Sequence, residues 1–445
     1  MADLDLSLPA RLLAAVEQLV WSTYMVAREF PYTILPLILI AFVSSAVLAF
    51  FIGLHIIAPK PRAPLPSEKT YITTTPDGLT TKPLPCWFDR WDAERKLSES
   101  AAPSKNAFDV PDTGEIEPAE VEVSVVIPAY NEEKRILPAL EEAVEYLDRK
   151  FGRPTSDERK KRIGSPPTTP HHRQFFRRAI RADATKDGEA NDATAVPAIP
   201  AIPAAGYEIL IVNDGSRDRT VDVALEFSRR HGLHDILRVV KLEKNRGKGG
   251  AVTHGFRHVR GQYVVFADAD GASKFSDLGR LVEGCEDVVD ASNRGVAIGS
   301  RGHLVGSEAV VQRSALRNFL MKSFHFVLMI LTPPATSRIR DTQCGFKLFS
   351  RAALPHIVPY MHMEGWIFDI EMLMLAESAP PTSVFASDGS VIGLAPGIRV
   401  AEVPIDWHEV EGTKMNIIKD SIGMALGMVI LRGSWMFGVY RRRIT

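Results

Sequence analysis

The sequence predicts an α/β fold in which a mostly parallel sheet carries helices on both faces. Apolar runs rich in β-branched residues start at five places, namely Val121, Tyr207, Leu237, Gly261 and Gly295. Helical patterns separate several of these runs, for example from Thr220 to Arg230 and from Gly249 to Val259. Strands joined by helices of this length form right-handed crossovers and therefore a parallel sheet. Ligands bind such sheets beyond the carboxyl ends of the strands, and the polar motifs of this chain fall at those ends.

The composition is that of a globular protein. Of the 445 residues, 45% are hydrophobic and 24% are charged, which excludes a mainly disordered, collagenous or coiled-coil chain. The 53 Lys and Arg residues balance 54 Asp and Glu residues, for a formal charge of −1. A nucleic-acid-binding protein would usually need a basic surplus, so no nucleic-acid partner is expected. Three widely spaced cysteines indicate neither a disulfide framework nor a Cys-rich zinc site, and they favour a reducing compartment.

A transmembrane helix is predicted over residues 33–58, because this segment contains no Asp, Glu, Lys or Arg. It is long enough to cross a bilayer core of about 30 Å. The alternatives are a buried core helix or a signal peptide, although a signal peptide has a shorter apolar region nearer the start of the chain. Lys60 and Arg62 follow the segment, so the positive-inside rule mildly favours a cytosolic carboxyl side. Residues 1–32 form an N-terminal segment with the pattern of a short amphipathic helix.

The rest of the chain divides by composition. Residues 59–118 are rich in Pro, Thr and charge, and we interpret them as a linker with ordered pieces around Trp87 and Trp91. A catalytic domain is expected over residues 119–415. Its first helix repeats apolar residues on one face, at Leu137, Leu140, Val144 and Leu147. Residues 149–205 are basic in their first half and rich in Ala and Pro in their second, which predicts an exposed, flexible insertion.

Acidic, amide or glycine groups follow four of the predicted strands. The first strand ends at Pro128–Glu132, the second ends at Asp214, the third is followed by Gly247 and Lys248, and the fourth ends at Asp268–Asp270. Each motif alone is weak, since Asp-Gly is a common turn pair and Asp3 and Asp5 repeat the acidic spacing outside any plausible site. Asp268 and Asp270 differ because they close an apolar strand, where two carboxylates would repel unless a cation neutralised them.

Oxygen ligands of this kind suit Mg²⁺ or Mn²⁺, which one or two carboxylates usually hold together with substrate phosphates. Asp268 and Asp270 are therefore the predicted metal ligands, and a nucleoside diphosphate is the predicted substrate class. In that setting Asp214 and the Asn131–Glu132 edge would hold the base and ribose, and Lys248 would lie near the phosphates. The glycines around Lys248 do not form a Walker loop, because Gly rather than Ser or Thr follows the lysine.

Several motifs in combination resemble family 2 glycosyltransferases with the GT-A fold. They are PAYNEE, VNDGSRDRT, NRGKGGAV, DADGASKF, IGSR, DTQCGFKLF, GWIFDIEML and IDWHEVEGTKMN. The set, and DADGASKF above all, is similar to the dolichyl-phosphate β-glucosyltransferases from Val121 to the C-terminus, apart from the insertion. The resemblance implies inverting transfer of glucose from UDP-glucose to dolichyl phosphate, which yields dolichyl β-D-glucosyl phosphate for protein N-glycosylation. It also implies a single-pass protein of the endoplasmic-reticulum membrane whose catalytic domain contacts membrane lipids and faces the cytosol.

The strand-end positions and the resemblance together select candidate site residues. The donor-nucleotide candidates are Pro128, Ala129, Tyr130, Asn131, Glu132, Asp214, Gly247, Lys248, Asp268 and Ala269. The catalytic candidates are Asp268, Asp270, Arg301, Gln343 and Asp369, with Glu371 as an alternative to Asp369. Arg301, Arg313 and Arg317 are candidates for the acceptor phosphate, because a guanidinium binds two phosphate oxygens at once. A solvated helix face is an equal alternative for Arg313 and Arg317, and Asp369 or Glu371 could simply cap a helix.

Two later segments are predicted to lie in the membrane interface as amphipathic helices. Residues 316–331 are apolar but short for a span. Residues 416–445 form a C-terminal membrane-associated segment, whose apolar part is interrupted by Lys419, Asp420 and Arg432. One alternative is that both segments are buried in the core, and another is a second span within residues 417–440.

Three other functions stay open. A dolichyl-phosphate mannose synthase would keep the fold and use GDP-mannose, and no single residue separates uracil binding from guanine binding. A processive polysaccharide synthase would carry several more spans and a Gln/Arg-rich acceptor motif, neither of which the sequence shows. A non-catalytic nucleotide-sugar-binding membrane module is disfavoured by the intact Asp214, Asp268 and Asp270, since a dead copy is free to lose them.

Overall fold

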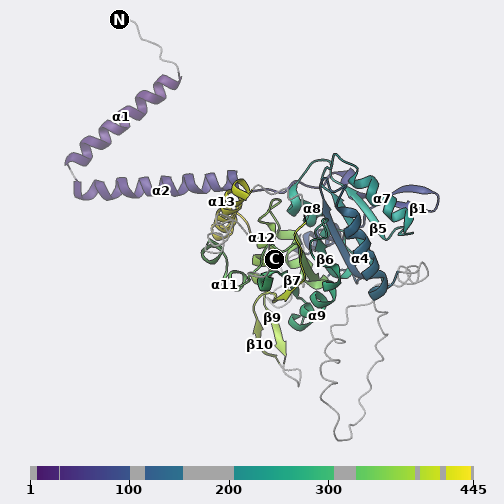
Figure 1. The fold of residues 1–445 in the computed structure, drawn as a ribbon. Helices are drawn as coiled ribbons and strands as arrows, with labels where there is room; N and C mark the ends of the chain where they lie inside the picture. The colour runs from purple at the N-terminus through teal and green to yellow at the C-terminus, as the bar shows by residue number, and fades with distance from the viewer. Residues whose placement is uncertain are drawn as a thin grey trace. The chain divides into compact units, whose positions relative to one another are not determined.

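The chain forms two compact units (Figure 1). A computed structural model describes residues 8–29, 31–100, 116–153, 205–304, 327–385, 391–410 and 417–441. The first unit comprises Met1–Ala58 and Gly433–Tyr440, and the second comprises Pro59–Arg432 and Arg441–Thr445. Each unit is therefore described separately.

The first unit contains two consecutive helices, α1 (Leu8–Glu29) and α2 (Pro31–Ile57). Of the helices that the structure describes, α2 alone is long and apolar enough to cross a membrane, over Pro36–Ile57. This agrees in length and composition with the span predicted for residues 33–58. Near the end of α2, the rings of Phe50 and Phe51 pack edge to face on Phe437, with centroids 5.2 and 5.5 Å apart.

The second unit is built around a nine-stranded sheet with the strand order β11-β7-β8-β6-β3-β4-β5-β1-β2. The strands are β1 (Thr70–Thr75), β2 (Gly78–Pro83), β3 (Val121–Ala129), β4 (Tyr207–Asn213), β5 (Leu237–Lys241), β6 (Gly261–Ala267), β7 (Val296–Ser300), β8 (Phe346–Ser350) and β11 (Val400–Pro404). The pairs β3/β4, β3/β6, β4/β5 and β7/β11 are parallel, whereas β8 and β1 are antiparallel to their neighbours. All strands except β1 and β8 thus run in one direction, and the predicted α/β class is confirmed.

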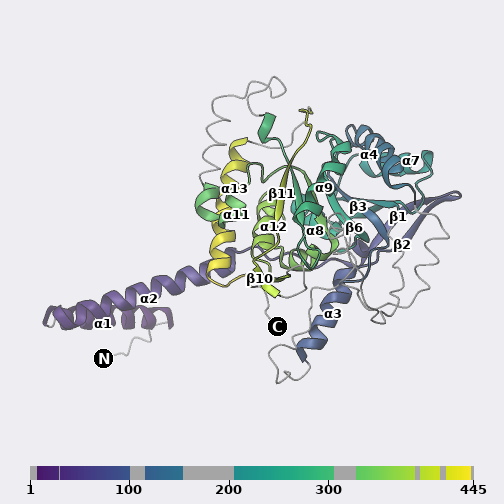
Figure 2. The same ribbon diagram turned by 90° about the horizontal axis from the view of Figure 1, so that it is seen from below.

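Helices cover both faces of this sheet (Figure 2). On one face lie α4 (Ile136–Phe151), α7 (Thr220–Arg230) and α9 (Leu278–Val288), and on the other lie α8 (Gly247–Phe256) and α12 (Phe368–Glu377). Consecutive side chains of a strand point to opposite faces. Val125 and Val126 of β3 are both fully buried, so both faces of the central strand are covered.

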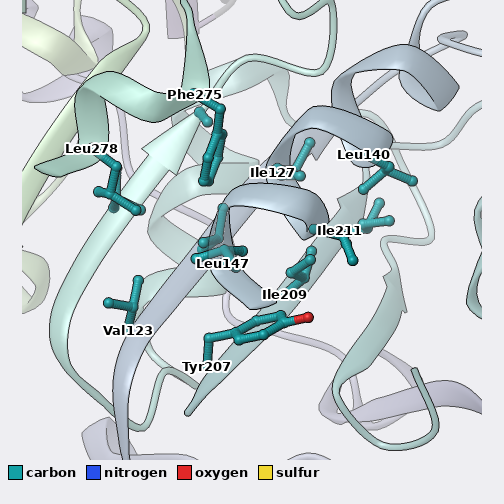
Figure 3. Packing of buried hydrophobic residues seen from close by; sticks show 14 of the residues in the cluster. Val123, Ile127, Leu140, Leu147, Tyr207, Ile209, Ile211, Phe275 and Leu278 are labelled. Carbon is teal, nitrogen blue, oxygen red and sulfur yellow. The ribbon is translucent and has the colours of Figure 1, made fainter. Parts of the chain in front are cut away.

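The core beneath α4 shows how the apolar pattern fixes the layers (Figure 3). Leu140 and Leu147, one side of α4, lie over Ile209 and Ile211 of β4. All four side chains are fully buried. Full burial of a Leu or Ile side chain contributes about 1.5–3 kcal/mol. This packing makes the strands a rigid support for the loops that follow them.

Residues 59–118 are not a linker throughout, which corrects the interpretation from composition. They contain a short 3₁₀ helix, η1 (Pro66–Lys69), the strands β1 and β2, and α3 (Trp87–Ser100). β1 joins the sheet beside β5, and the hydroxyl of Tyr71 donates to Asp235 Oδ1 at 2.6 Å. An Asp77-Gly78 turn between two Thr-rich runs is a hairpin signal that composition alone had hidden. The ordered pieces expected around Trp87 and Trp91 belong to α3.

Several further elements complete the second unit. They are η2 (Phe275–Asp277), η3 (Gly302–Leu304), α11 (Pro334–Ser337), η4 (Arg351–His356), η5 (Val358–Tyr360), the hairpin β9 (Thr382–Phe385) and β10 (Val391–Ala395), and α13 (Ile417–Met436). The part of α13 that belongs to this unit, up to Arg432, has one buried side and one exposed side. Met424 and Met428 are buried, whereas Ile422, Leu426 and Val429 are more than half exposed. The other predicted interfacial helix covers residues 316–331. Its residues 316–326 lie outside the described part of the chain.

The predicted insertion leaves the domain at the end of α4 and returns at the start of β4. This is the amino-terminal edge of the parallel strands. Its two stems are joined, because the hydroxyl of Tyr207 donates to Asp148 Oδ1 at 2.7 Å. Arg153, on the same stem as Asp148, pairs with this carboxylate at 2.7 Å. Residues 154–204 lie outside the described part of the chain.

Candidate active site

The predicted site residues meet at the carboxyl-terminal edge of the parallel strands. In the sheet register Ala129, the last residue of β3, lies beside Asn213, the last residue of β4. The Asp214 N–H then donates to the Ala129 carbonyl at 2.8 Å. β6, which ends just before Asp268, pairs with the other side of β3. The loops after these three strands therefore share one edge of the sheet, as predicted.

The loop after β3 is tied to the loop after β4. Asn131 has a φ of 54°, a left-handed conformation that Asn tolerates better than most residues. Its N–H donates to Ser216 Oγ at 2.9 Å, and its side-chain oxygen accepts from Arg217 N at 2.8 Å. The carboxylate of Glu132 pairs with Arg135 at 2.7 Å. Glu132 therefore shapes this loop, whereas the ring of Tyr130 is accessible at the edge.

Asp214 connects the loop after β4 with the loop before α8. Its side chain is buried, and its Oδ1 accepts a hydrogen bond from Arg246 N at 2.6 Å. The amide of Asn245 donates to the Asp214 carbonyl at 2.9 Å. Burial raises the pKa of Asp214 to about 6, although the N–H groups of Arg246 and Gly247 oppose this shift. At pH 7 the group is thus mostly an anionic acceptor.

Lys248, Asp268 and Asp369 form one cluster of charges. Lys248 Nζ lies 2.5 Å from Asp268 Oδ1. Burial disfavours the charge of Lys248, but the carboxylates of Asp268 and Asp369 outweigh it and raise the pKa of the lysine. Asp369, at the start of α12, forms an ion pair with Lys347 of β8, and both side chains are buried. Burial raises the pKa of Asp369 above its ordinary value, against the effect of Lys347 and Lys248.

A glycine allows the close approach of β8 to Asp268. The N–H of Asp268 donates to the Gly345 carbonyl at 3.2 Å, and a Cβ on Gly345 would overlap the Asp268 carboxylate. The side chain of Asp268 can therefore keep its position only if residue 345 has no side chain.

Gly345→Ala should lower the activity of this candidate site by about 100-fold, because a displacement of about 1 Å in an active site has an effect of that order. Gly393→Ala in β10 is the matched control, since nothing lies within 4 Å of a Cβ placed there. Activity is measured on variants whose thermal unfolding has been recorded. A Gly345→Ala enzyme with normal activity would show that Asp268 need not keep this position.

Asp268 and Asp270, the predicted metal ligands, are both accessible at this edge. Their side chains are 34% and 27% exposed, so both reach the surface of the edge. Asp270 Oδ1 accepts from Ala272 N at 3.1 Å, and its Oδ2 lies 3.9 Å from Arg135. Among the residues that the structure describes, no group of three or more His, Cys, Asp or Glu could hold a metal. A cation here would need substrate oxygens for the rest of its shell, as Mg²⁺ does at phosphates.

Arg301, a candidate for the acceptor phosphate, is held by Asp341. Its Nε and Nη2 donate to the two Asp341 oxygens at 2.7 and 2.8 Å. The guanidinium lies 5.5 Å from the centre of the Trp407 ring, and Trp407 pairs with Ser273 in the loop after Asp270. The charge of Asp268 also acts on Arg301, so the guanidinium lies near the charge cluster. Arg313 and Arg317 lie outside the described residues.

The remaining candidates have different surroundings. The amide of Gln343 points to the sulfur of Met424 in α13, at 3.8 Å. Glu371 is fully buried and accepts from the N–H groups of His362 and Met363 at 2.8 and 2.7 Å. It therefore holds the loop before α12, and Asp369 is the residue of the two that joins the charge cluster.

Two residues of this site were not predicted, Lys347 and Asp341. Lys347 had a signal in the sequence, since it is a charged residue inside the apolar run FKLF. A lysine that is fully buried requires a partner with the opposite charge. Asp341 opens the motif DTQCGFKLF, but its pairing with Arg301, 40 positions away along the chain, left no local signal.

Comparison with known proteins defines the class first. Residues 197–354 match the family model described as glycosyl transferase family 2, and with the α/β fold above this makes the chain a glycosyltransferase of the GT-A type. It is 34% identical to the dolichyl-phosphate beta-glucosyltransferase of Saccharomyces cerevisiae, over 89% of this chain and 92% of that one. It is also 34% identical to the Homo sapiens enzyme of the same name, over 72% of this chain and 78% of that one. The chain belongs to the dolichyl-phosphate beta-glucosyltransferase family.

Among solved structures, glucosyl-3-phosphoglycerate synthase from Mycobacterium tuberculosis in complex with UDP is similar at a TM-score of 0.38. The sequence identity is 15%, and the match covers 71% of this chain and 79% of that chain.

Proposed function

We propose that this protein transfers glucose from UDP-glucose to dolichyl phosphate with inversion, with Mg²⁺ or Mn²⁺ as cofactor. The observation that carries the proposal is the relationship to dolichyl-phosphate beta-glucosyltransferases over nearly the whole chain. The site geometry supports it, because Asp214, Lys248 and Asp268 lie at one sheet edge where a nucleoside diphosphate would bind.

The donor half of the site would bind the nucleotide and stabilise the negative charge of the leaving diphosphate. Asp214 would accept hydrogen bonds from the base or ribose, beside the loop of Asn131. Asp268 and Asp270 would hold the cation, which when bound supplies Lewis-acid neutralisation of the leaving diphosphate. Lys248 adds a fixed positive charge at the same place, since its neighbouring carboxylates raise its pKa.

The acceptor half needs positioning more than proton transfer. A phosphate monoester has a second pKa of about 6 and is mostly dianionic at pH 7, so no strong general base is required. Asp369 is engaged in a buried ion pair with Lys347, which is consistent with a reaction that needs no strong general base. Arg301, oriented by Asp341, would hold the acceptor phosphate against the anomeric carbon. Arg313 and Arg317 are proposed to assist it.

We further propose a single-pass location in the endoplasmic-reticulum membrane, with the catalytic domain in the cytosol. The apolar length of α2 supports an anchor. The exposed apolar side of α13, formed by Ile422, Leu426 and Val429, supports contact of this C-terminal helix with membrane lipids.

The test uses detergent-solubilised protein, dolichyl phosphate and either labelled UDP-glucose or labelled GDP-mannose, with and without EDTA. Lipid-extractable label from UDP-glucose alone, lost with EDTA, is the expected result. Label from GDP-mannose would assign a mannose synthase instead. No transfer from either donor, despite nucleotide binding, would contradict the proposed reaction and favour a non-catalytic module.

A further inference from the structure

A short segment connects the end of α2 with β1, residues 59–69, which we call the strap. Within it Glu68 is fully buried, which is unusual for a carboxylate unless several donors surround it. Arg62 donates to its two oxygens at 2.6 and 3.1 Å, and the Leu65 N–H donates at 2.8 Å. Burial opposes ionisation, but these donors and the N–H of Glu243 prevail and hold the pKa of Glu68 at about 2. Glu68 is therefore charged throughout the physiological pH range.

A hydrogen-bond donor outside the strap shows which part of the domain Glu68 holds. The N–H of Glu243, in the loop between β5 and α8, donates to Glu68 Oε1 at 3.0 Å. Ser67 Oγ donates to the Glu243 carboxylate at 2.7 Å. The Glu68 carbonyl lies 2.9 Å from His254 Nε2 of α8. The strap is thus bonded to the loop before α8 and to α8 itself.

That loop leads directly to the nucleotide edge. Asn245, two residues after Glu243, donates to the Asp214 carbonyl, and the N–H of Arg246 donates to the Asp214 carboxylate. Arg246 forms an ion pair with Glu364, and the charge of Glu364 also acts on Arg62 of the strap. One short stretch of chain, residues 243–246, is therefore hydrogen-bonded to the strap at Glu243 and to Asp214 at Asn245 and Arg246.

We propose that Glu68 is a positioning residue for the donor nucleotide. Through Glu68, the strap that follows the membrane helix holds the loop of Asn245 and Arg246 against Asp214. The inference rests on the proposed use of Asp214 in nucleotide binding. It gives the strap a role in the reaction in addition to its connection to the membrane helix. A residue acting through such a network changes a binding constant by about 0.5–2 kcal/mol, or roughly 2- to 30-fold.

The test is Glu68→Gln, which keeps the size of the side chain and removes its charge. UDP affinity should weaken, and the KM for UDP-glucose should rise, by roughly 2- to 30-fold. The KM for dolichyl phosphate and kcat should stay within about twofold. Arg62→Gln should shift the donor KM in the same direction, and Glu68→Asp should restore part of the affinity. Lys69→Gln is the matched control, since its pair with Asp89 is 40% and 48% exposed and does not reach the loop.

The outcomes separate this inference from the function on which it rests. A lower unfolding temperature with unchanged UDP affinity in both Glu68→Gln and Arg62→Gln would make Glu68 purely structural and overturn the inference. The same holds if Lys69→Gln weakens UDP binding equally. If the wild-type protein binds neither UDP nor GDP in the presence of Mn²⁺, the proposed function fails and the inference fails with it.

Discussion

Replacement of Asp270 by Asn is expected to reduce glucosyl transfer by at least about 100-fold, while the fold is retained. Asparagine keeps an oxygen that can accept from the Ala272 N–H, so the loop after β6 can keep its shape. The charge that would help to hold the cation is lost, and even changes to groups that only support a metal ligand cost about 10–100-fold. Initial rates at saturating donor and acceptor, over a range of Mn²⁺ concentrations, provide the measurement.

The control for Asp270→Asn is Asp222→Asn, the same change at an exposed position of α7. It should leave the rate unchanged. Full activity of the Asp270→Asn enzyme at low Mn²⁺ would remove Asp270 from the proposed metal site and leave Asp268 as the one carboxylate there.

The second large effect concerns stability. Lys347→Met should lower the free energy of unfolding by about 3–5 kcal/mol, because it leaves Asp369 buried without its cation. The ion pair is almost completely inaccessible, with side-chain exposures of 0% and 4%. In a chain of 445 residues the unfolding temperature should fall by at least about 3 °C. The double variant Lys347→Met/Asp369→Asn should recover much of the loss, since it removes the isolated charge.

Lys96→Met is the matched control for this measurement. Its pair with Asp92 is exposed, at 64% and 35%, and such pairs contribute about 1 kcal/mol or less. Equal unfolding temperatures for Lys347→Met and Lys96→Met would show that the buried pair is not important for stability. Failure of the double variant to recover would show that Lys347 stabilises the fold through its apolar stem and not through its charge.

Local patterns predicted the centre of the fold well. The helix expected from Thr220 to Arg230 is α7 with the same bounds, and the strands at Val121 and Tyr207 begin where their apolar runs begin. These elements are buried on one or both faces, so their periodicity is strong. β8 and β11 were not predicted as strands. Their place in the sheet depends on pairing with β6 and β7, which lie far away in the sequence.

The candidate site divides in the same way. Asp214, Lys248 and Asp268 follow strands that the sequence shows plainly, and the parallel order of the strands brings them together. The partners that orient the site come from distant segments instead. Asp341, before β8, pairs with Arg301, after β7, and Lys347 of β8 pairs with Asp369 of α12. No local pattern records such long-range pairs, so they became visible only in three dimensions.

The joined stems of the insertion have a consequence for how this enzyme can change over evolution. Because the Tyr207 hydroxyl donates to Asp148, the domain itself brings the ends of the insertion together. Each doubling of the length of a loop closed in this way costs only about 0.6 kcal/mol. The stems also lie at the amino-terminal edge of the parallel strands, opposite to the edge that carries the candidate site. Residues can therefore be gained or lost at this point without a penalty in catalysis, and relatives should differ in length here more freely than at any loop that follows a strand.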